Sequence, residues 1–139
     1  MYNDSRENYN HRQLQSISAE AIQSDRVRQS LKDVPDWVQT YVAWHKEQRL
    51  HHLHDPETKF ITVTCHKNYA CGGLSDRLRA LPYFLLAAHK MQRVLFIHWQ
   101  KFSLEDFLVP PVGGLDWRLP EEFQDLGGKE NQALNTICD

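Results

Sequence analysis

The sequence predicts an α/β fold, an incomplete Rossmann-like parallel-sheet half preceded by an amphipathic helix. A β-branched and aromatic segment, "FITVTC" from Phe60, and a nearly continuous apolar run, "RVLFIHW" at 93–99, both predict strands. Between them, apolar residues recur at helical spacing from Leu74 to Ala88. A strand, a helix and a strand in this order predict a βαβ unit with a parallel strand pair.

The composition divides the chain of 139 residues into four parts. Residues 1–32 are rich in Asn, Gln, Ser, Arg and Glu, which predicts a disordered or weakly helical leader. The amphipathic helix is expected at 33–54, the partial Rossmann-like βαβ unit at 55–120, and a loop-like end at 121–139. Because two strands alone make a poor sheet, we expect the βαβ unit to be the first part of a larger α/β domain.

The helix expected at 33–54 has start signals and one apolar face. Asp33 is the expected N-cap, and Pro35 falls in the first turn, where its missing N–H costs little. The apolar face consists of Val34, Trp37, Val38, Tyr41, Val42 and Trp44. Because these residues keep helical spacing, we expect the aromatic ones to be core contacts rather than the lining of a sugar site.

The helix between the two strands contains a proline. Its apolar face consists of Leu74, Leu78, Leu81, Leu85 and Ala88, widened by Phe84 and Met91. Pro82 predicts either a kink or a main helical part that starts after a short first turn. Further along, "SLEDFL" at 103–108 predicts a short capped helix, which "VPPVGG" ends.

Composition and charge disfavour several classes of partner. The formal net charge is −2, from 16 basic and 18 acidic residues, which gives no reason to expect nucleic acid or an anionic membrane. No apolar run approaches the roughly 20 residues of a membrane span. The polar start, "MYNDSRENYNHRQ", does not predict a secretory signal.

The cysteines and histidines do not predict a metal site. Cys65, Cys71 and Cys138 are too few for a disulfide framework. Cys65 and Cys71 flank a short loop and can pair in an oxidising compartment, but two separate thiols is the favoured interpretation. Together with His66 they lack a fourth zinc ligand at standard spacing. The group His51, His52, His54 and Asp55 is expected to be a solvated helix end.

Two glycines, Gly72 and Gly73, lie in the loop that follows the first strand segment, in "YACGGLSDR". Open α/β sheets bind their ligands beyond the carboxyl ends of their strands, where Gly72 and Gly73 would lie. Glycine allows positive φ and close approach of backbone to a ligand. Free N–H groups at the start of the next helix favour a phosphate, and Arg77 can add a bidentate contact.

The same turn also has a purely structural interpretation. Ser75 or Asp76 can cap the helix, and Asp76 would repel a phosphate, so we expect it to cap or to orient Arg77 or Arg79. The sequence has neither G-x-x-x-x-G-K-[ST] nor G-x-G-x-x-G, so a P-loop NTPase and a dinucleotide fingerprint are disfavoured. From the residues alone, a ligand loop and a plain turn both remain open.

The combined motifs resemble a known superfamily. The turn "GGLSDRLRA" at 72–80 fits G-G-x-x-[DN]-R-x-[RK]-[GA], and "RVLFIHW" fits an R-V-h-x-h-x-W strand. The segment "YVAWHKEQR" is similar to a Y-x-x-[FW]-H helix. Together, over roughly 34–117, they resemble the start of the catalytic region of fucosyltransferase-like glycosyltransferases, which include protein O-fucosyltransferases, α-1,6-fucosyltransferases and xyloglucan fucosyltransferases.

This resemblance implies a GT-B-like arrangement of two facing Rossmann-like halves in the Golgi or ER lumen. It implies a nucleotide-sugar donor, GDP-fucose, and inverting transfer to a hydroxyl of a glycan or protein acceptor, without a metal or other cofactor. By position, the backbone of Gly72 and Gly73 would form a wall near donor or acceptor. Arg77 is the first side-chain candidate and Arg79 the second, and no residue is assigned as catalytic.

One motif of the superfamily is missing from this sequence. Members carry an H-x-R-x-[GS]-[DN] motif in their C-terminal half, and its arginine binds the donor. The present sequence does not contain this motif, so we expect a partial transferase that is inactive as an isolated chain. The alternative is a non-catalytic α/β binding or scaffold domain.

Overall fold

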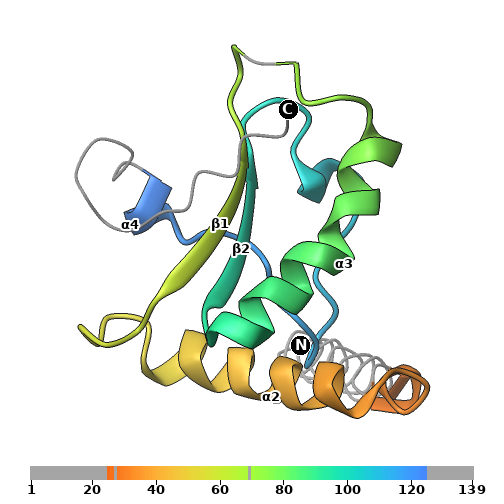
Figure 1. Ribbon diagram of the computed structural model, residues 1–139, viewed down its shortest axis with the longest axis vertical. Coiled ribbons are helices and arrows are strands. Elements are labelled where there is room, and N and C mark those ends of the chain that lie inside the picture. Colours follow the sequence, from red (N-terminus) through yellow and green to blue (C-terminus); the bar gives the residue numbers. More distant parts are fainter. Residues whose placement is uncertain (1–24, 27, 69, 125–139) are drawn as a thin grey trace, which may run out of the picture.

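The computed structural model describes residues 25, 26, 28–68 and 70–124. The fold is mixed α/β, with a two-stranded parallel sheet and helices around it (Figure 1), as the sequence predicts. The elements are α2 (Asp36–His51), β1 (Phe60–Cys65), α3 (Leu74–Met91), β2 (Val94–Trp99), the 3₁₀ helix η1 (Leu104–Asp106) and α4 (Glu121–Gln124).

Strand β2 lies between two partners. On one side it pairs in parallel with β1, with Phe60 opposite Val94 and Cys65 opposite Trp99. On the other side Ile97 forms a parallel bridge to Arg118. Burial alternates along β1 but is almost continuous along β2, as the apolar run of β2 predicts.

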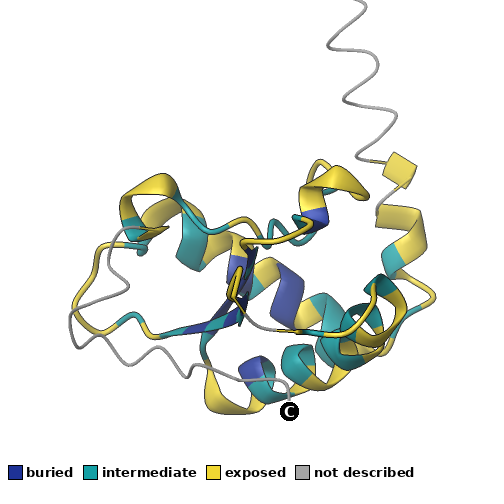
Figure 2. Cartoon of the chain, turned by 90° about the horizontal axis from the view of Figure 1, so that it is seen from above, coloured by how far each residue is buried: buried dark blue, intermediate teal, exposed yellow. Residues whose placement is uncertain are grey.

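One face of the sheet packs against α3, and buried residues gather where strands and helices meet (Figures 1 and 2). Ile61 and Leu95 belong to a core cluster with Ala88 of α3. The predicted apolar face of α3 is confirmed, because Leu74, Leu78, Leu81, Phe84 and Leu85 pack on this cluster. Met91 was expected to widen the face, but its side chain is 46% exposed.

Helix α2 is attached to the amino end of β2 through Tyr41. The buried Tyr41 hydroxyl donates to the Arg93 carbonyl at 2.9 Å and accepts from the Leu95 N–H at 3.1 Å. The ring of Tyr41 also contacts the rings of Trp44 and His89. The expected core role of this aromatic face is therefore confirmed for Tyr41.

One predicted helix detail is wrong, and another is narrowed. Asp33 does not cap α2, which begins at Asp36 with Pro35 as N-cap and no side-chain cap. The ring of Pro35 disfavours a helical backbone at the residue before it, Val34, so the helix can begin only beyond Val34. Of the two outcomes predicted at Pro82, a main part that starts after a short first turn is excluded, because α3 is continuous from Leu74 to Met91, and the kink stays a prediction.

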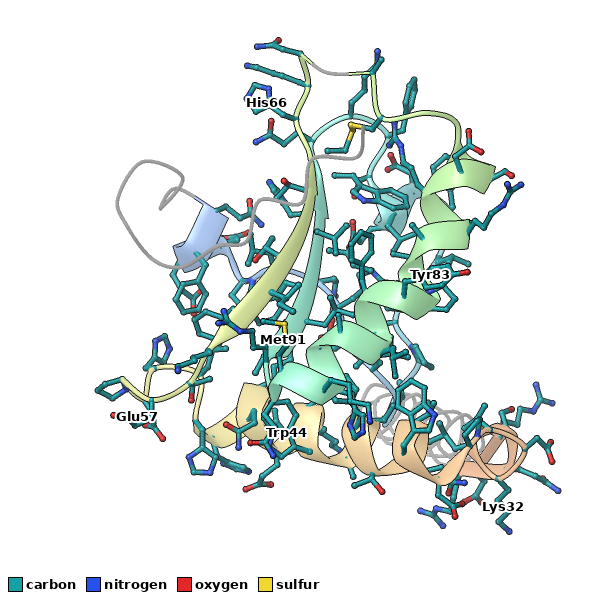
Figure 3. The ribbon with its side chains drawn as sticks, in the orientation of Figure 1. Lys32, Trp44, Glu57, His66, Tyr83 and Met91 are labelled. Carbon is teal, nitrogen blue, oxygen red and sulfur yellow. A yellow bond between two sulfur atoms is a disulfide. The ribbon has the colours of Figure 1, made fainter. Side chains whose placement is uncertain are left out.

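The expectation of two separate thiols is also wrong. Cys65 and Cys71 form a disulfide, which Figure 3 shows near the carboxyl end of β1. The turn of the chain after β1 brings their Cα atoms to 5.9 Å, well inside the range that a disulfide spans. Cys138 lies outside the described residues.

The two ends of the chain are described only in part. In the expected leader, residues 25, 26 and 28–31 are helical, and residues 1–24 lie outside the description. The expected loop-like end begins instead with the short helix α4, and residues 125–139 lie outside the description. The short helix expected at 103–108 is present as η1, with Ser103 as N-cap. No helix among the described residues is long and apolar enough to cross a membrane.

Candidate functional site

A partly open hollow of about 420 Å³ lies beyond the carboxyl ends of β1 and β2. We call it the glycine-loop hollow. Residues 70–74 and Arg77 line one side, and Lys101, Phe102 and Phe107 line the other. The structure therefore places Gly72, Gly73 and Arg77 around one hollow, at the edge where α/β sheets bind ligands. Arg79 is exposed on α3 and does not line it.

The two glycines have different conformations. Gly72 has φ +71°, and a Cβ at this position would lie 3.1 Å from Oδ2 of Asp76. Gly73 is extended, with φ −75°, and a Cβ there would meet nothing within 4 Å. Only Gly72 therefore needs to be glycine for reasons internal to the chain.

Asp76 stabilises the start of α3, which is a structural role that the sequence predicts for it. Its Oδ2 accepts a hydrogen bond from the N–H of Gly73 at 3.4 Å, across the first turn of α3. This contact stabilises the helix start. It also occupies one of the N–H groups that a phosphate could use, so positive side chains must supply most of the attraction for an anion.

Arg77 is fixed in position but has an unused hydrogen-bond donor. Its Nη1 donates to the Lys101 carbonyl at 2.8 Å, and its guanidinium carbon lies 5.2 Å from the centre of the Trp99 ring. Its Nε is buried and has no partner in the described part of the chain. A buried polar group without a partner costs about 1–3 kcal/mol, so a ligand acceptor at this position would be favourable.

The second side of the hollow was not predicted. Lys101, Phe102 and Phe107 follow β2, and the Lys101 ammonium lies 5.7 Å from the centre of the Phe102 ring. Phe102 has φ +53° and a side chain that is 63% exposed. A signal did exist: the loops after two parallel strands emerge at the same edge of a sheet, so the loop after "RVLFIHW" belonged to the candidate site as well.

Two cross-links hold the loops around this hollow. The disulfide ties Cys71, next to the glycines, to Cys65 at the end of β1. The side chain of Gln100, just after β2, accepts from the N–H of Lys67, and its backbone N–H donates to the Cys65 carbonyl at 2.9 Å. The loops after β1 and β2 are therefore connected to each other as well as to the sheet.

The histidines near the end of α2 do not converge on one point. His52 contacts the Asp55 carboxylate at 2.8 Å, whereas the exposed His54 lies 3.7 Å from Glu122. Within 25–124, apart from residues 27 and 69, no three His, Cys, Asp or Glu side chains are placed to hold a metal ion. Cys65 is in the disulfide, so the separate thiol that a zinc ligand or nucleophile needs is not present there.

Comparison with known proteins adds no family to this description. No family model, no curated protein and no solved structure matches the chain. A functional conclusion therefore depends on the motifs of the sequence and on the geometry of the glycine-loop hollow.

Proposed function

We propose that this chain forms one wall of the donor cleft of a fucosyltransferase-like glycosyltransferase. In this proposal the full enzyme transfers a sugar from a nucleotide-sugar, GDP-fucose, to a hydroxyl of a glycan or protein acceptor with inversion. The glycine-loop hollow is the part of that cleft that this chain supplies. The second, GT-B-like half would supply the H-x-R-type motif, which this sequence does not contain.

One observation carries the proposal: Arg77 lines the hollow with a guanidinium that is fixed in place, and its buried Nε–H has no partner among the described residues. A diphosphate oxygen accepts hydrogen bonds and carries the opposite charge. Charge-assisted hydrogen bonds of this kind are about twice as strong as neutral ones. The nearby Lys101 lines the same hollow and adds a second positive charge.

The chemistry of the transfer gives these groups a role. When the sugar leaves, negative charge grows on the diphosphate, and preorganised donors that meet this charge lower the barrier. Arg77 is preorganised because Trp99 and the Lys101 carbonyl hold its guanidinium in place. The open space beside Gly73 would let the ligand approach the backbone closely.

The proposal is tested by titrating the chain with GDP and with GDP-fucose in a calorimeter. Arg77→Ala removes the donor from the hollow. Arg79→Ala is the matched control, since it removes the same charge from an exposed position on the same helix. We expect both ligands to bind the wild type and Arg79→Ala alike, and Arg77→Ala to bind them at least about tenfold more weakly.

Two other results would count against this assignment. Equal loss of affinity in Arg77→Ala and Arg79→Ala would indicate general charge attraction rather than a site. If the folded wild type binds neither ligand at millimolar concentration, the glycine turn is a structural feature, and the non-catalytic binding or scaffold domain becomes the better description.

A further inference from the structure

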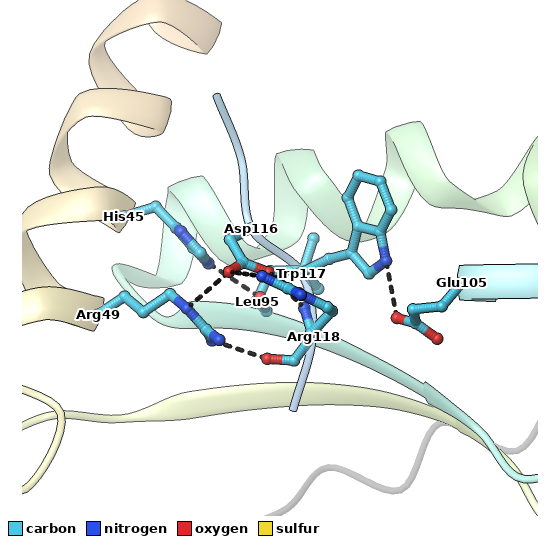
Figure 4. Close-up of polar contacts among 7 residues, drawn as sticks. All are labelled: His45, Arg49, Leu95, Glu105, Asp116, Trp117 and Arg118. Atoms are coloured by element: carbon cyan, nitrogen blue, oxygen red, sulfur yellow. Dashed lines mark hydrogen bonds and ion pairs between the residues drawn. The ribbon is translucent and has the colours of Figure 1, made fainter. Parts of the chain in front are cut away.

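A second hollow, of about 230 Å³, lies between α2 and the segment 110–118. It shares no lining residue with the glycine-loop hollow. Its polar lining comes from His45, Lys46 and Arg49 of α2, and from Asp116 and Arg118 on the segment that runs beside β2. Figure 4 shows His45, Arg49, Asp116 and Arg118. We call it the arginine hollow.

The charged groups of this hollow are already oriented. Arg118 binds Asp116 through two N–H···O contacts, at 2.9 and 2.8 Å. Nε of Arg49 lies 3.3 Å from the same carboxylate, and its Nη1 donates to the Arg118 carbonyl at 2.7 Å. A guanidinium carries more N–H groups than these contacts use, so both arginines keep donors for a further acceptor.

The electrostatic balance favours an anion. Lys46, Arg49 and Arg118 are positive, whereas Asp116 is the acid among the described residues that line the hollow. Burial raises the pKa of Asp116, but hydrogen bonds from Arg118 and the charge of Arg49 outweigh this and hold that pKa below its usual value. Asp116 therefore stays ionised and fixes the arginines without cancelling their combined charge.

His45 adds an acceptor of a different kind. The side chain is fully buried, and its Nε2 lies 2.9 Å from the Leu95 carbonyl, which can only accept, so Nε2 carries the proton. Burial lowers the pKa of His45, which keeps the ring neutral and leaves a lone pair on Nδ1. Nδ1 is buried and has no partner among the described residues.

We propose that the arginine hollow binds a small hydroxycarboxylate. The free N–H groups of Arg49 and Arg118 hold its carboxylate, and Nδ1 of His45 accepts a hydrogen bond from its hydroxyl. The pairing of donors and acceptor distinguishes this ligand class from simple anions. Sulfate or acetate has no O–H donor at neutral pH, so either would satisfy the arginines and leave Nδ1 unpartnered.

The test compares glycolate with acetate, which differ by one hydroxyl, and with sulfate, which carries no hydroxyl at neutral pH. Each is titrated into the ¹⁵N-labelled chain, and affinities are read from the backbone and arginine Nε signals. We expect glycolate to bind at least about tenfold more tightly than acetate, with shifts at His45, Arg49 and Arg118. The glycine-loop hollow shares no lining with this site, so its signals report separately on any anion that binds at Arg77 and Lys101.

Two variants assign the contacts. His45→Gln places an amide N–H where Nε2 donates to Leu95 but removes the acceptor at Nδ1, so the preference for glycolate should disappear while acetate still binds. Arg118→Gln changes a half-exposed side chain and should weaken both carboxylates, whereas Arg79→Gln should weaken neither.

Several results would overturn the proposal. If none of the three ligands shifts the signals of the arginine hollow, the hollow is not a binding site for them. Equal affinity for glycolate and acetate in the wild type would show that Nδ1 of His45 does not bind the hydroxyl. This measurement does not depend on whether a variant folds. Tighter binding of sulfate than of glycolate would reassign the hollow to a simple anion.

Discussion

The guanidinium carbon of Arg77 lies 5.2 Å from the centre of the Trp99 ring, so the last residue of β2 positions the best anion-binding candidate on α3. A planar guanidinium stacks on an aromatic face, and this contact contributes on the order of 1 kcal/mol. The same side chain reaches the Lys101 carbonyl. Arg77 therefore links α3 to the end of β2 while it borders the hollow.

Replacing Arg77 with lysine tests this link. Arg77→Lys keeps the charge but loses the planar group, so we expect the free energy of unfolding to fall by about 1 kcal/mol. Urea unfolding measures it, with Arg79→Lys as the exposed control expected to stay within about 0.5 kcal/mol of the wild type. Equal stability of the two variants would contradict the stacking role.

Replacement by alanine should affect the two glycines differently. Gly72→Ala forces an L-residue into the left-handed region beside Asp76, so stability should fall by about 1 kcal/mol. Gly73→Ala enters an ordinary extended conformation with free space, and the lower freedom of the unfolded chain offsets the weaker N-cap preference of alanine, so stability should stay within about 0.5 kcal/mol of the wild type. Denaturant melts of both variants give the comparison, and equal losses at Gly73 and Gly72 would contradict the special role of the positive φ at Gly72.

The disulfide can be tested by peptide mapping. Trypsin cleaves after Lys59, Lys67 and Arg77, so a non-reducing digest should contain peptide 60–67 linked to peptide 68–77. Reduction should lower the free energy of unfolding by about 2 kcal/mol, because the bond restricts the unfolded chain. Cys71→Ala is the control, since a reductant should not change its stability through this bond. Two unlinked peptides in the oxidised chain would refute the pairing.

Local pattern predicted the elements well. The apolar run of β2 and the leucine spacing of α3 predicted the parallel strand–helix–strand unit that the structure shows. A strand buried on both faces has a continuous apolar run, whereas a helix buried on one face has apolar residues at helical spacing, so the two patterns can be told apart in the sequence. The disulfide was mispredicted because Cα separation depends on how the chain turns after β1, which residue types do not encode. The prediction of an N-cap at Asp33 was wrong because Pro35 sets the start of α2.

The candidate site was predicted from one side only. The motif at Gly72 and Arg77 marked the loop after β1, but Lys101 and Phe102 carry no motif and enter the hollow through the sheet topology. The contacts of His45 with β2 were missed for the same reason. Its place four residues after Tyr41 put it on the buried face, yet its partner Leu95 is fifty positions away.

His45 should give the chain a pH-dependent stability. Burial lowers its pKa in the folded state from 6.5, while Arg49 and Asp116 act on it in opposite directions. Below pH 6.5 the unfolded chain therefore binds more protons than the folded chain, and stability falls as pH decreases, by at most about 1.4 kcal/mol per pH unit from this group. His45→Gln should remove that part of the slope between pH 7 and 5. Parallel pH profiles for the two proteins in urea unfolding would contradict it.

The most direct test of the proposed function is a GDP titration of the ¹⁵N-labelled chain followed by backbone and arginine Nε spectra. We predict shifts that saturate at Gly72, Gly73 and Arg77 and in the loop from Lys101 to Phe107, with little change at His45 and Arg118. Shifts confined to the arginine hollow, or no saturable shift at millimolar GDP, would contradict the assignment of the glycine loop as the wall of a nucleotide-sugar site.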